Sequence, residues 1–177
     1  MDKEAIIHQY DFNLAYAREL IFDVSDEQMT VIPAIGLENH PAFTLGHLVA
    51  GSADLNRDLG GEFSIPEGWD ALFVRVGPGD PRLPNLDRDY PSKVELLEEL
   101  HRQHERVKNH LRLASENELA QPITWRFSTY MPTLGEVVMF MCVNHEAMHL
   151  GQLAAWRRAM GFNSALARVK HNSRPYH

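Results

Sequence analysis

The segment TLGEVVMFMCVNHEAMHLGQLAAWRRAMG, residues 133–161, has the pattern of one long amphipathic helix. It opens with a capping box formed by Thr133 and Glu136, and it ends at Gly161, a residue type that commonly follows a helix. The stripe expected to face the core, at three- and four-residue steps, consists of Val138, Met141, His145, His149, Gln152 and Trp156. Two histidines of this helix are therefore predicted to lie on its buried face.

Three further segments, at residues 3–24, 41–59 and 92–116, have the same helical period. A connection rich in glycine and proline, residues 60–91, separates the second from the third. A connection of this length is typical of a crossover or of a segment that builds a site. No strand pattern is convincing, although residues 123–127 alternate briefly. The sequence thus predicts an all-α fold, a four-helix bundle with one long crossover.

Length and composition indicate one soluble domain. The chain has 177 residues, 44% of them apolar, so we expect a single core and one domain spanning residues 1–177. The net charge of −7 argues against the basic surface that nucleic-acid binding needs. The sequence shows neither a signal peptide nor a long apolar run, so we expect a cytoplasmic protein without membrane contact. The single cysteine, Cys142, excludes a disulfide within the chain.

His145 and His149 lie four residues apart, a spacing that puts both side chains on one face of a helix. Their imidazoles can share one transition-metal ion, and two buried imidazoles are costly without a shared partner. His47, on the second helix, is the best third ligand. Gly51 lies on the same side of the second helix as His47, and its small size would let another helix come close. Asp54 is suited to accept a hydrogen bond from the free N–H of His47. Three histidines with an open fourth position form a catalytic type of site.

His104 occupies a core position of the third helix and has three interpretations. It can be a fourth ligand, a proton-transfer group at the open site, or a core histidine with a hydrogen-bond partner. We favour the last. The other histidines fall off the apolar stripes or in loops and are predicted to be surface residues: His8, His40, His101, His110, His171 and His177.

Residues 145–149 also spell H-E-x-x-H, the signature of zincin metallopeptidases. The Gly and His of the extended signature would fall at Gln152 and Ala155, which do not match. No Asp or Glu follows Glu146, so only His171 remains as a downstream ligand. A peptidase also needs an edge strand for its substrate. A peptidase is therefore disfavoured, and Glu146 is predicted to be a flanking or surface carboxylate, with a role near water at the metal left open.

Two motifs occur in a fixed order: Gly46-His47-Leu48, and then His145-x3-His149-x-Gly151-Gln152-Leu153 followed by Arg157 and Gly161. In these motifs the chain resembles the DinB/YfiT-like family of bacterial bundle proteins over nearly its whole length. The resemblance implies an up-up-down-down four-helix bundle with the long crossover between helices two and three. It also implies one divalent metal, zinc, nickel or iron, held by His47, His145 and His149. We expect Asp54 and Gln152 to lie next to these ligands. Many members look dimeric, so the resemblance also implies a homodimer.

Two functions remain open. Relatives of the family include metal-dependent hydrolases and thiol transferases that use bacillithiol or mycothiol, which implies activation of water or a thiol for reaction with a small molecule. Glu146 and His104 are then the candidates for proton transfer. Alternatively, the protein is a metal-binding stress-response module without turnover. In either case we expect residues 60–91, with Trp69 and Phe73, to lie beside the open face of the metal site and shape its pocket. The alternative is that these aromatic side chains attach the segment to the outside of the bundle or to a second subunit.

Overall fold

The structure is a computed structural model that describes residues 1–75 and 83–169. Within these residues the secondary structure is helical, and β pairing is limited to an isolated bridge between Pro122 and Thr133. The predicted all-α class is thus confirmed, and residues 123–127, whose sequence alternates, form no strand but lead from this bridge into a turn. None of the described helices is both long enough and apolar enough to span a membrane.

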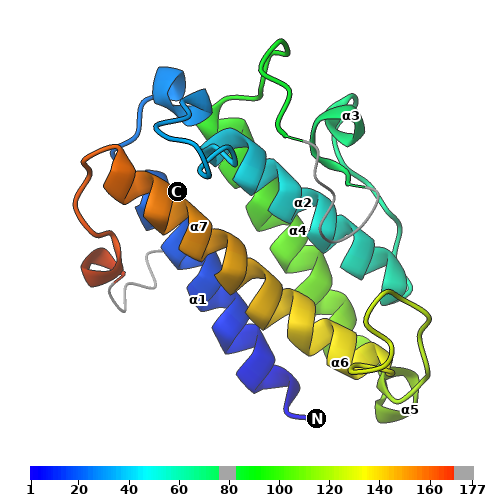
Figure 1. Cartoon of the computed structure of the whole chain (residues 1–177). Coiled ribbons are helices and arrows are strands. Elements are labelled where there is room, and N and C mark those ends of the chain that lie inside the picture. The colour runs from blue at the N-terminus through cyan, green and yellow to red at the C-terminus, as the bar shows by residue number, and fades with distance from the viewer. Residues whose placement is uncertain (76–82, 170–177) are drawn as a thin grey trace.

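Four long helical segments lie side by side (Figure 1). They are α1 (Lys3–Ile21), α2 (Pro41–Asp58), α4 (Lys93–Leu113) and a continuous last segment made of α6 (Leu134–Met139), η2 (Phe140–His145) and α7 (Glu146–Ala159). Short helices occupy the connections: η1 (Asp26–Thr30), α3 (Trp69–Phe73), α5 (Glu116–Leu119) and η3 (Leu166–Arg168). The helix starts follow the predicted chemistry, because Ser92 and Thr133 each form a complete capping box.

The directions of the four segments follow from contacts at their ends. Lys93, at the start of α4, donates to the Val24 carbonyl just past the end of α1 at 2.5 Å, so α1 and α4 are antiparallel. Arg157, near the end of α7, donates to the Leu20 carbonyl near the end of α1 at 2.9 Å, so α1 and α7 are parallel. Figure 1 shows α2 running in the same direction as α4.

The order of directions is therefore up, down, down, up, and the predicted up-up-down-down order is not observed. The difference lies in the first connection. Residues 22–40 join neighbouring ends of α1 and α2, so these two helices are antiparallel. Residues 59–92 join the parallel helices α2 and α4, and this connection must return along the 18-residue α2, a distance of about 27 Å. The predicted long crossover between the second and third long helices is thus present.

The core consists of two clusters of buried apolar side chains. The first is near the start of α2 and the end of α7, and includes Leu14, Leu45, Leu48, Phe73 and Trp156. The second lies toward the other end, and includes Ile7, Tyr10, Leu55, Val107 and Val138. Arg157 anchors the end of α7 because its buried guanidinium pairs with Asp23. The helix positions that carry the three candidate ligands are fixed by these clusters.

Candidate metal centre

The structure brings together His47 on α2, His145 at the end of η2 and His149 on α7. One candidate ligand nitrogen of each lies within 4.8 Å of the other two. The ring centroids are 5.5 Å apart for His47 and His145, 4.8 Å for His47 and His149, and 4.6 Å for His145 and His149. Nitrogens that share an ion at about 2.0–2.1 Å lie about 3–4 Å apart. Small side-chain adjustments therefore suffice for the three imidazoles to hold one metal ion.

Hydrogen bonds orient two of the three rings. The Nδ1 of His47 is 3.2 Å from the carbonyl oxygen of Phe73, and the Nδ1 of His149 is 3.2 Å from Oε1 of Gln152. Both partners are oxygens that only accept, so each Nδ1 donates and each Nε2 is left with a free lone pair. This is the arrangement in which metal-binding histidines usually occur, because the second hydrogen bond fixes both tautomer and ring orientation.

The electrostatic environment keeps the three imidazoles neutral. Burial, together with the neighbouring His149 and His47, lowers the pKa of His145 to about 3. Burial also lowers the pKa of His149 to about 4, and it lowers the pKa of His47. A neutral imidazole is the form that binds a metal, so at neutral pH no proton has to be removed before an ion binds. The donor set thus fits a divalent transition metal.

Glycines let the neighbouring segments approach the centre. A Cβ atom at Gly51 would lie 3.3 Å from Cε1 of His145, so the predicted close approach at Gly51 is confirmed. A Cβ atom at Gly46 would lie 2.2–2.4 Å from three carbons of the Phe73 ring, which fills this space. Gly46 therefore allows α3 to dock on α2, and this docking brings the Phe73 carbonyl to His47.

Asp54 does not have the role predicted for it. The Nδ1 of His47 contacts the Phe73 carbonyl, and Asp54 instead pairs with Arg57 at 2.8 Å. Asp54 lies two turns beyond His47 on α2, so a partner from another segment reaches the ring more directly than a partner on the same helix. No sequence pattern marks this partner, because it is a backbone carbonyl 26 residues away.

Glu146 and His104 form a buried pair instead of lying at the three-histidine cluster. Glu146 is only 3% exposed, so the surface position predicted for it is wrong. Its Oε1 is 2.8 Å from Nε2 of the fully buried His104, whose ring stacks on Tyr10 at 3.5 Å. Burial raises the pKa of Glu146 and lowers the pKa of His104 to about 3. The interpretation of His104 as a core histidine with a hydrogen-bond partner agrees with this geometry.

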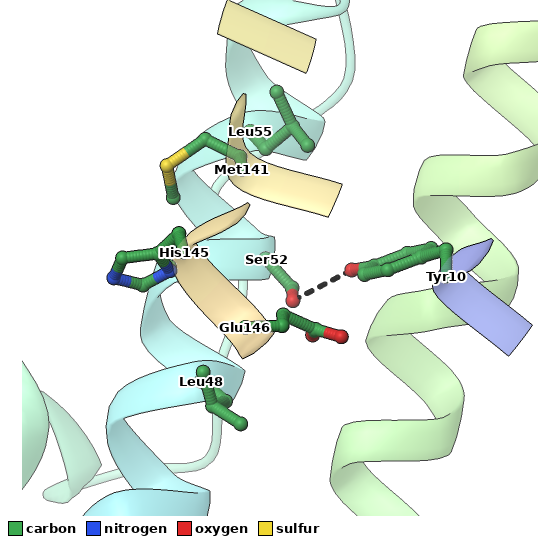
Figure 2. A pocket seen from close by; sticks show the side chains of 8 residues that line it. Tyr10, Leu48, Ser52, Leu55, Met141, His145 and Glu146 are labelled. Carbon is green, nitrogen blue, oxygen red and sulfur yellow. Dashed lines mark hydrogen bonds between the residues drawn. The ribbon is translucent and has the colours of Figure 1, made fainter. Parts of the chain in front are cut away.

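Figure 2 shows that His145 and Glu146 point to opposite sides of their helix. Both line a small pocket with Tyr10, Ser52 and Met141, but the Glu146 carboxyl is directed toward Tyr10 and the His145 ring away from it. The hydroxyls of Tyr10 and Ser52 complete the polar group at 2.8 Å from each other. The helix thus separates a histidine cluster on one side from a buried acid–base pair on the other.

Aromatic side chains flank the three histidines. The Phe43 ring stacks on His47 with centroids 5.8 Å apart. The Phe140 ring is 6.3 Å from that of His145 and contacts Phe127. The segment expected to lie beside the site does so through Phe73. The Phe73 ring packs into the core instead of covering a pocket, and its backbone carbonyl contacts His47. Residues 76–82 of that segment, and His171 and His177, lie outside the described residues.

One more histidine was misassigned from sequence. His40 is fully buried, and its Nδ1 accepts from the Phe43 backbone N–H at 3.2 Å, so it caps the start of α2. Histidine is an uncommon cap residue, and the sequence therefore gave no reason to place it there.

A sequence model of the DinB superfamily matches residues 9–153, about four fifths of the chain. The matched range includes His47, His145 and His149 and ends just after Gln152. No curated protein and no solved structure matches the chain. The family match agrees with the motifs at residues 46–48 and 145–153 and with the all-helical fold. This chain belongs to the DinB superfamily.

Proposed function

We propose that the protein is a metal-dependent enzyme in which His47, His145 and His149 hold one divalent transition metal. The substrate is a small molecule that reacts with water, in a hydrolysis, or with a low-molecular-weight thiol, in a thiol transfer. One observation carries this proposal: three neutral histidines from two facing helical segments converge, and two have their Nδ1 atoms engaged with accepting oxygens.

A divalent metal held by three histidines leaves coordination positions open, and it lowers the pKa of a water or thiol bound there toward neutrality. Zinc, nickel and iron all accept imidazole ligands, so the donor set is compatible with each of them. The chain's own contribution is to hold the ligands. The Phe73 carbonyl and Gln152 restrain the rings of His47 and His149, and Gly51 lets α2 approach His145.

The surroundings of the centre support reaction with a partly apolar substrate. Phe43 next to His47 and Phe140 next to His145 reduce the access of bulk water from two sides. A low-dielectric surrounding strengthens the interaction of a metal cation with a negatively charged nucleophile. These residues therefore favour a thiolate or hydroxide over a neutral nucleophile at neutral pH.

The catalytic roles of Glu146 and His104 stay predictions. Their 2.8 Å contact suits exchange of a proton between them, but the Glu146 side chain points away from that of His145. We therefore assign the pair no contact with substrate. A Glu146→Gln variant tests this assignment, because a direct general base at the metal would lose most turnover on that change.

The test is a turnover screen of the protein reconstituted with Zn²⁺, Ni²⁺ or Fe²⁺. Activated esters, epoxides and aryl halides are offered with water alone and with bacillithiol or mycothiol. The expected result is turnover that needs the metal and disappears in His149→Ala, while His8→Ala, a change at an exposed histidine of α1, keeps it. Stable metal binding without turnover in any reaction would favour the non-catalytic stress-response module.

A further inference from the structure

The last long helical segment contains a π-helical turn at Phe140–His145, directly before α7. A π turn accommodates one residue more than an α-helical turn, and such turns are uncommon and often lie at functional sites. Here the turn ends on the candidate ligand His145. The sequence pattern of residues 133–161, interpreted as one regular helix, did not indicate it.

The π turn aligns two buried faces. Val138 and Cys142 before or within the turn, and Leu150 and Trp156 after it, are all at most 1% exposed. Each α-helical residue rotates the chain by about 100°. An uninterrupted α-helix of the same sequence would therefore rotate the buried face of α7 by about 100° relative to that of α6. The extra residue in the π turn removes this offset. His145 is the last residue of the π turn, directly before α7.

Asn13 of α1 occupies the gap in the backbone hydrogen bonds of this turn. The Glu146 N–H bonds to the Val143 carbonyl and not to the Cys142 carbonyl four residues back. The Cys142 carbonyl instead accepts from the side-chain amide of Asn13 at 3.0 Å, and the Val143 carbonyl lies 3.4 Å from the same nitrogen. Asn13 is itself only 6% exposed, so water is not a ready substitute for its amide.

We propose that Asn13 is a positioning residue of the metal centre: its amide holds the π turn open and thereby directs His145 toward His47 and His149. This inference rests on the proposed function in taking the three histidines as metal ligands. Without the Asn13 donor, the Cys142 carbonyl loses this partner, and the backbone of the turn rearranges to regain one. Because the buried faces of α6 and α7 stay packed in the core, the rearrangement is confined to the end of the turn, where it displaces His145 from the cluster.

The first test measures Zn²⁺ affinity of purified wild type and Asn13→Ala by competition with a chromophoric chelator. The expected loss is about 10- to 100-fold, the range usual for residues that orient metal ligands. The matched control is Tyr10→Phe, which removes a buried hydrogen bond of the same helix, to Ser52 of α2, and keeps the packing of the Tyr10 ring. Equal affinity of Asn13→Ala and wild type, or an equal loss in Tyr10→Phe, would overturn the proposal.

The second test removes the need for the π turn. Deleting the exposed Asn144 leaves one residue fewer, so the segment can be α-helical while both buried faces stay aligned. The deletion variant is expected to bind Zn²⁺ nearly as well as wild type, and adding Asn13→Ala to it should cost almost nothing. A deletion variant that folds but loses Zn²⁺ binding, or a full loss on adding Asn13→Ala, contradicts the proposal. This test remains valid if Asn13→Ala alone does not fold.

Crystal structures of the metal-free wild type and Asn13→Ala separate this inference from the proposed function. If the wild type binds none of Zn²⁺, Ni²⁺ and Fe²⁺, the metal-centre proposal fails, but the structures still decide the role of Asn13. We expect the backbone of the π turn to be rearranged in the variant and His145 to be displaced from His47. A variant with the π turn intact would refute the inference even if the metal centre is real.

Discussion

His145 and Glu146 are neighbours in the chain, yet their side chains lie on opposite sides of one helix (Figure 2). His145 faces His47 and His149, while Glu146 bonds to His104 in the core at 2.8 Å. In zincin peptidases the glutamate of H-E-x-x-H is the general base at the metal. The orientation of Glu146 excludes that arrangement here, although the sequence letters are the same.

We therefore expect the protein not to be a peptidase. The Zn²⁺-loaded protein should release no fragments from casein or from a peptide library, because the Glu146 carboxyl is directed away from the candidate metal ligands. The assay is mass spectrometry of the products after prolonged incubation, with thermolysin as the positive control. Metal-dependent cleavage that is abolished in Glu146→Gln would contradict this expectation.

The Glu146–His104 pair should stabilise the fold through a neutral hydrogen bond. Burial raises the pKa of Glu146, so its carboxyl is favoured in the neutral form that a glutamine amide resembles. Glu146→Gln should therefore lower the free energy of unfolding only slightly. Glu146→Ala leaves the His104 Nε2 unpaired in the core and should cost about 1–3 kcal/mol. Urea unfolding of the metal-free proteins measures both values, and equal losses in the two variants would speak against a neutral bond.

Two glycines of α2 should respond differently to alanine. Gly46→Ala forces the fully buried Phe73 ring to move, because the new methyl would lie 2.2–2.4 Å from three ring carbons. It should cost about 1–3 kcal/mol of stability. In Gly51→Ala the new Cβ atom would lie 3.3 Å from Cε1 of His145. This change should cost little stability but weaken Zn²⁺ binding about tenfold, because it shifts the His145 ring. Thermal unfolding and metal titration test the pair, and the reverse pattern would contradict the assigned positions.

His40 should make the metal-free protein less stable as the pH falls. Burial lowers its folded-state pKa to about 4, against about 6.5 in the unfolded chain. The unfolded state therefore binds the proton first, so stability is full above pH 6.5 and falls between pH 6.5 and about 4. The contribution is about 3 kcal/mol, since one pKa unit corresponds to about 1.4 kcal/mol.

His40→Asn keeps a side chain that caps α2 but cannot become protonated in this range. Its unfolding free energy should decline less than that of wild type between pH 7 and pH 4.5. His8→Asn, a change at an exposed histidine, should follow the wild-type curve. Parallel curves for wild type and His40→Asn would show that His40 does not titrate as described.

The helices and the candidate ligands could be predicted from the sequence because both depend on the local spacing of apolar residues and histidines. The long helices could be recognised from their capping boxes and apolar steps, and their starts agree with α1, α2, α4 and α6 within about two residues. The spacing of His145 and His149 fixes their common face once the helix is known. His47 was found because a paired metal site needs a further ligand from a facing helix.

The remaining features depend on contacts between distant segments. The Phe73 carbonyl at His47 is a backbone group, and no residue type marks it. The buried position of Glu146 involves His104, a partner 42 residues away on α4, and the π turn before it involves Asn13, 129 residues from Cys142. The direction of α2 depends on which ends residues 22–40 connect, and helical periodicity carries no information about this.

Metal titration most directly tests whether His47, His145 and His149 hold one metal ion. The proteins are the wild type, His149→Ala and His8→Ala, and the isolated complexes are submitted to elemental analysis. The wild type and His8→Ala should each bind one Zn²⁺, Ni²⁺ or Fe²⁺ per chain, because His8 lies outside the cluster of His47, His145 and His149. His149→Ala should lose the ion on gel filtration. A His149→Ala protein that retains one metal per chain with wild-type affinity would contradict the account.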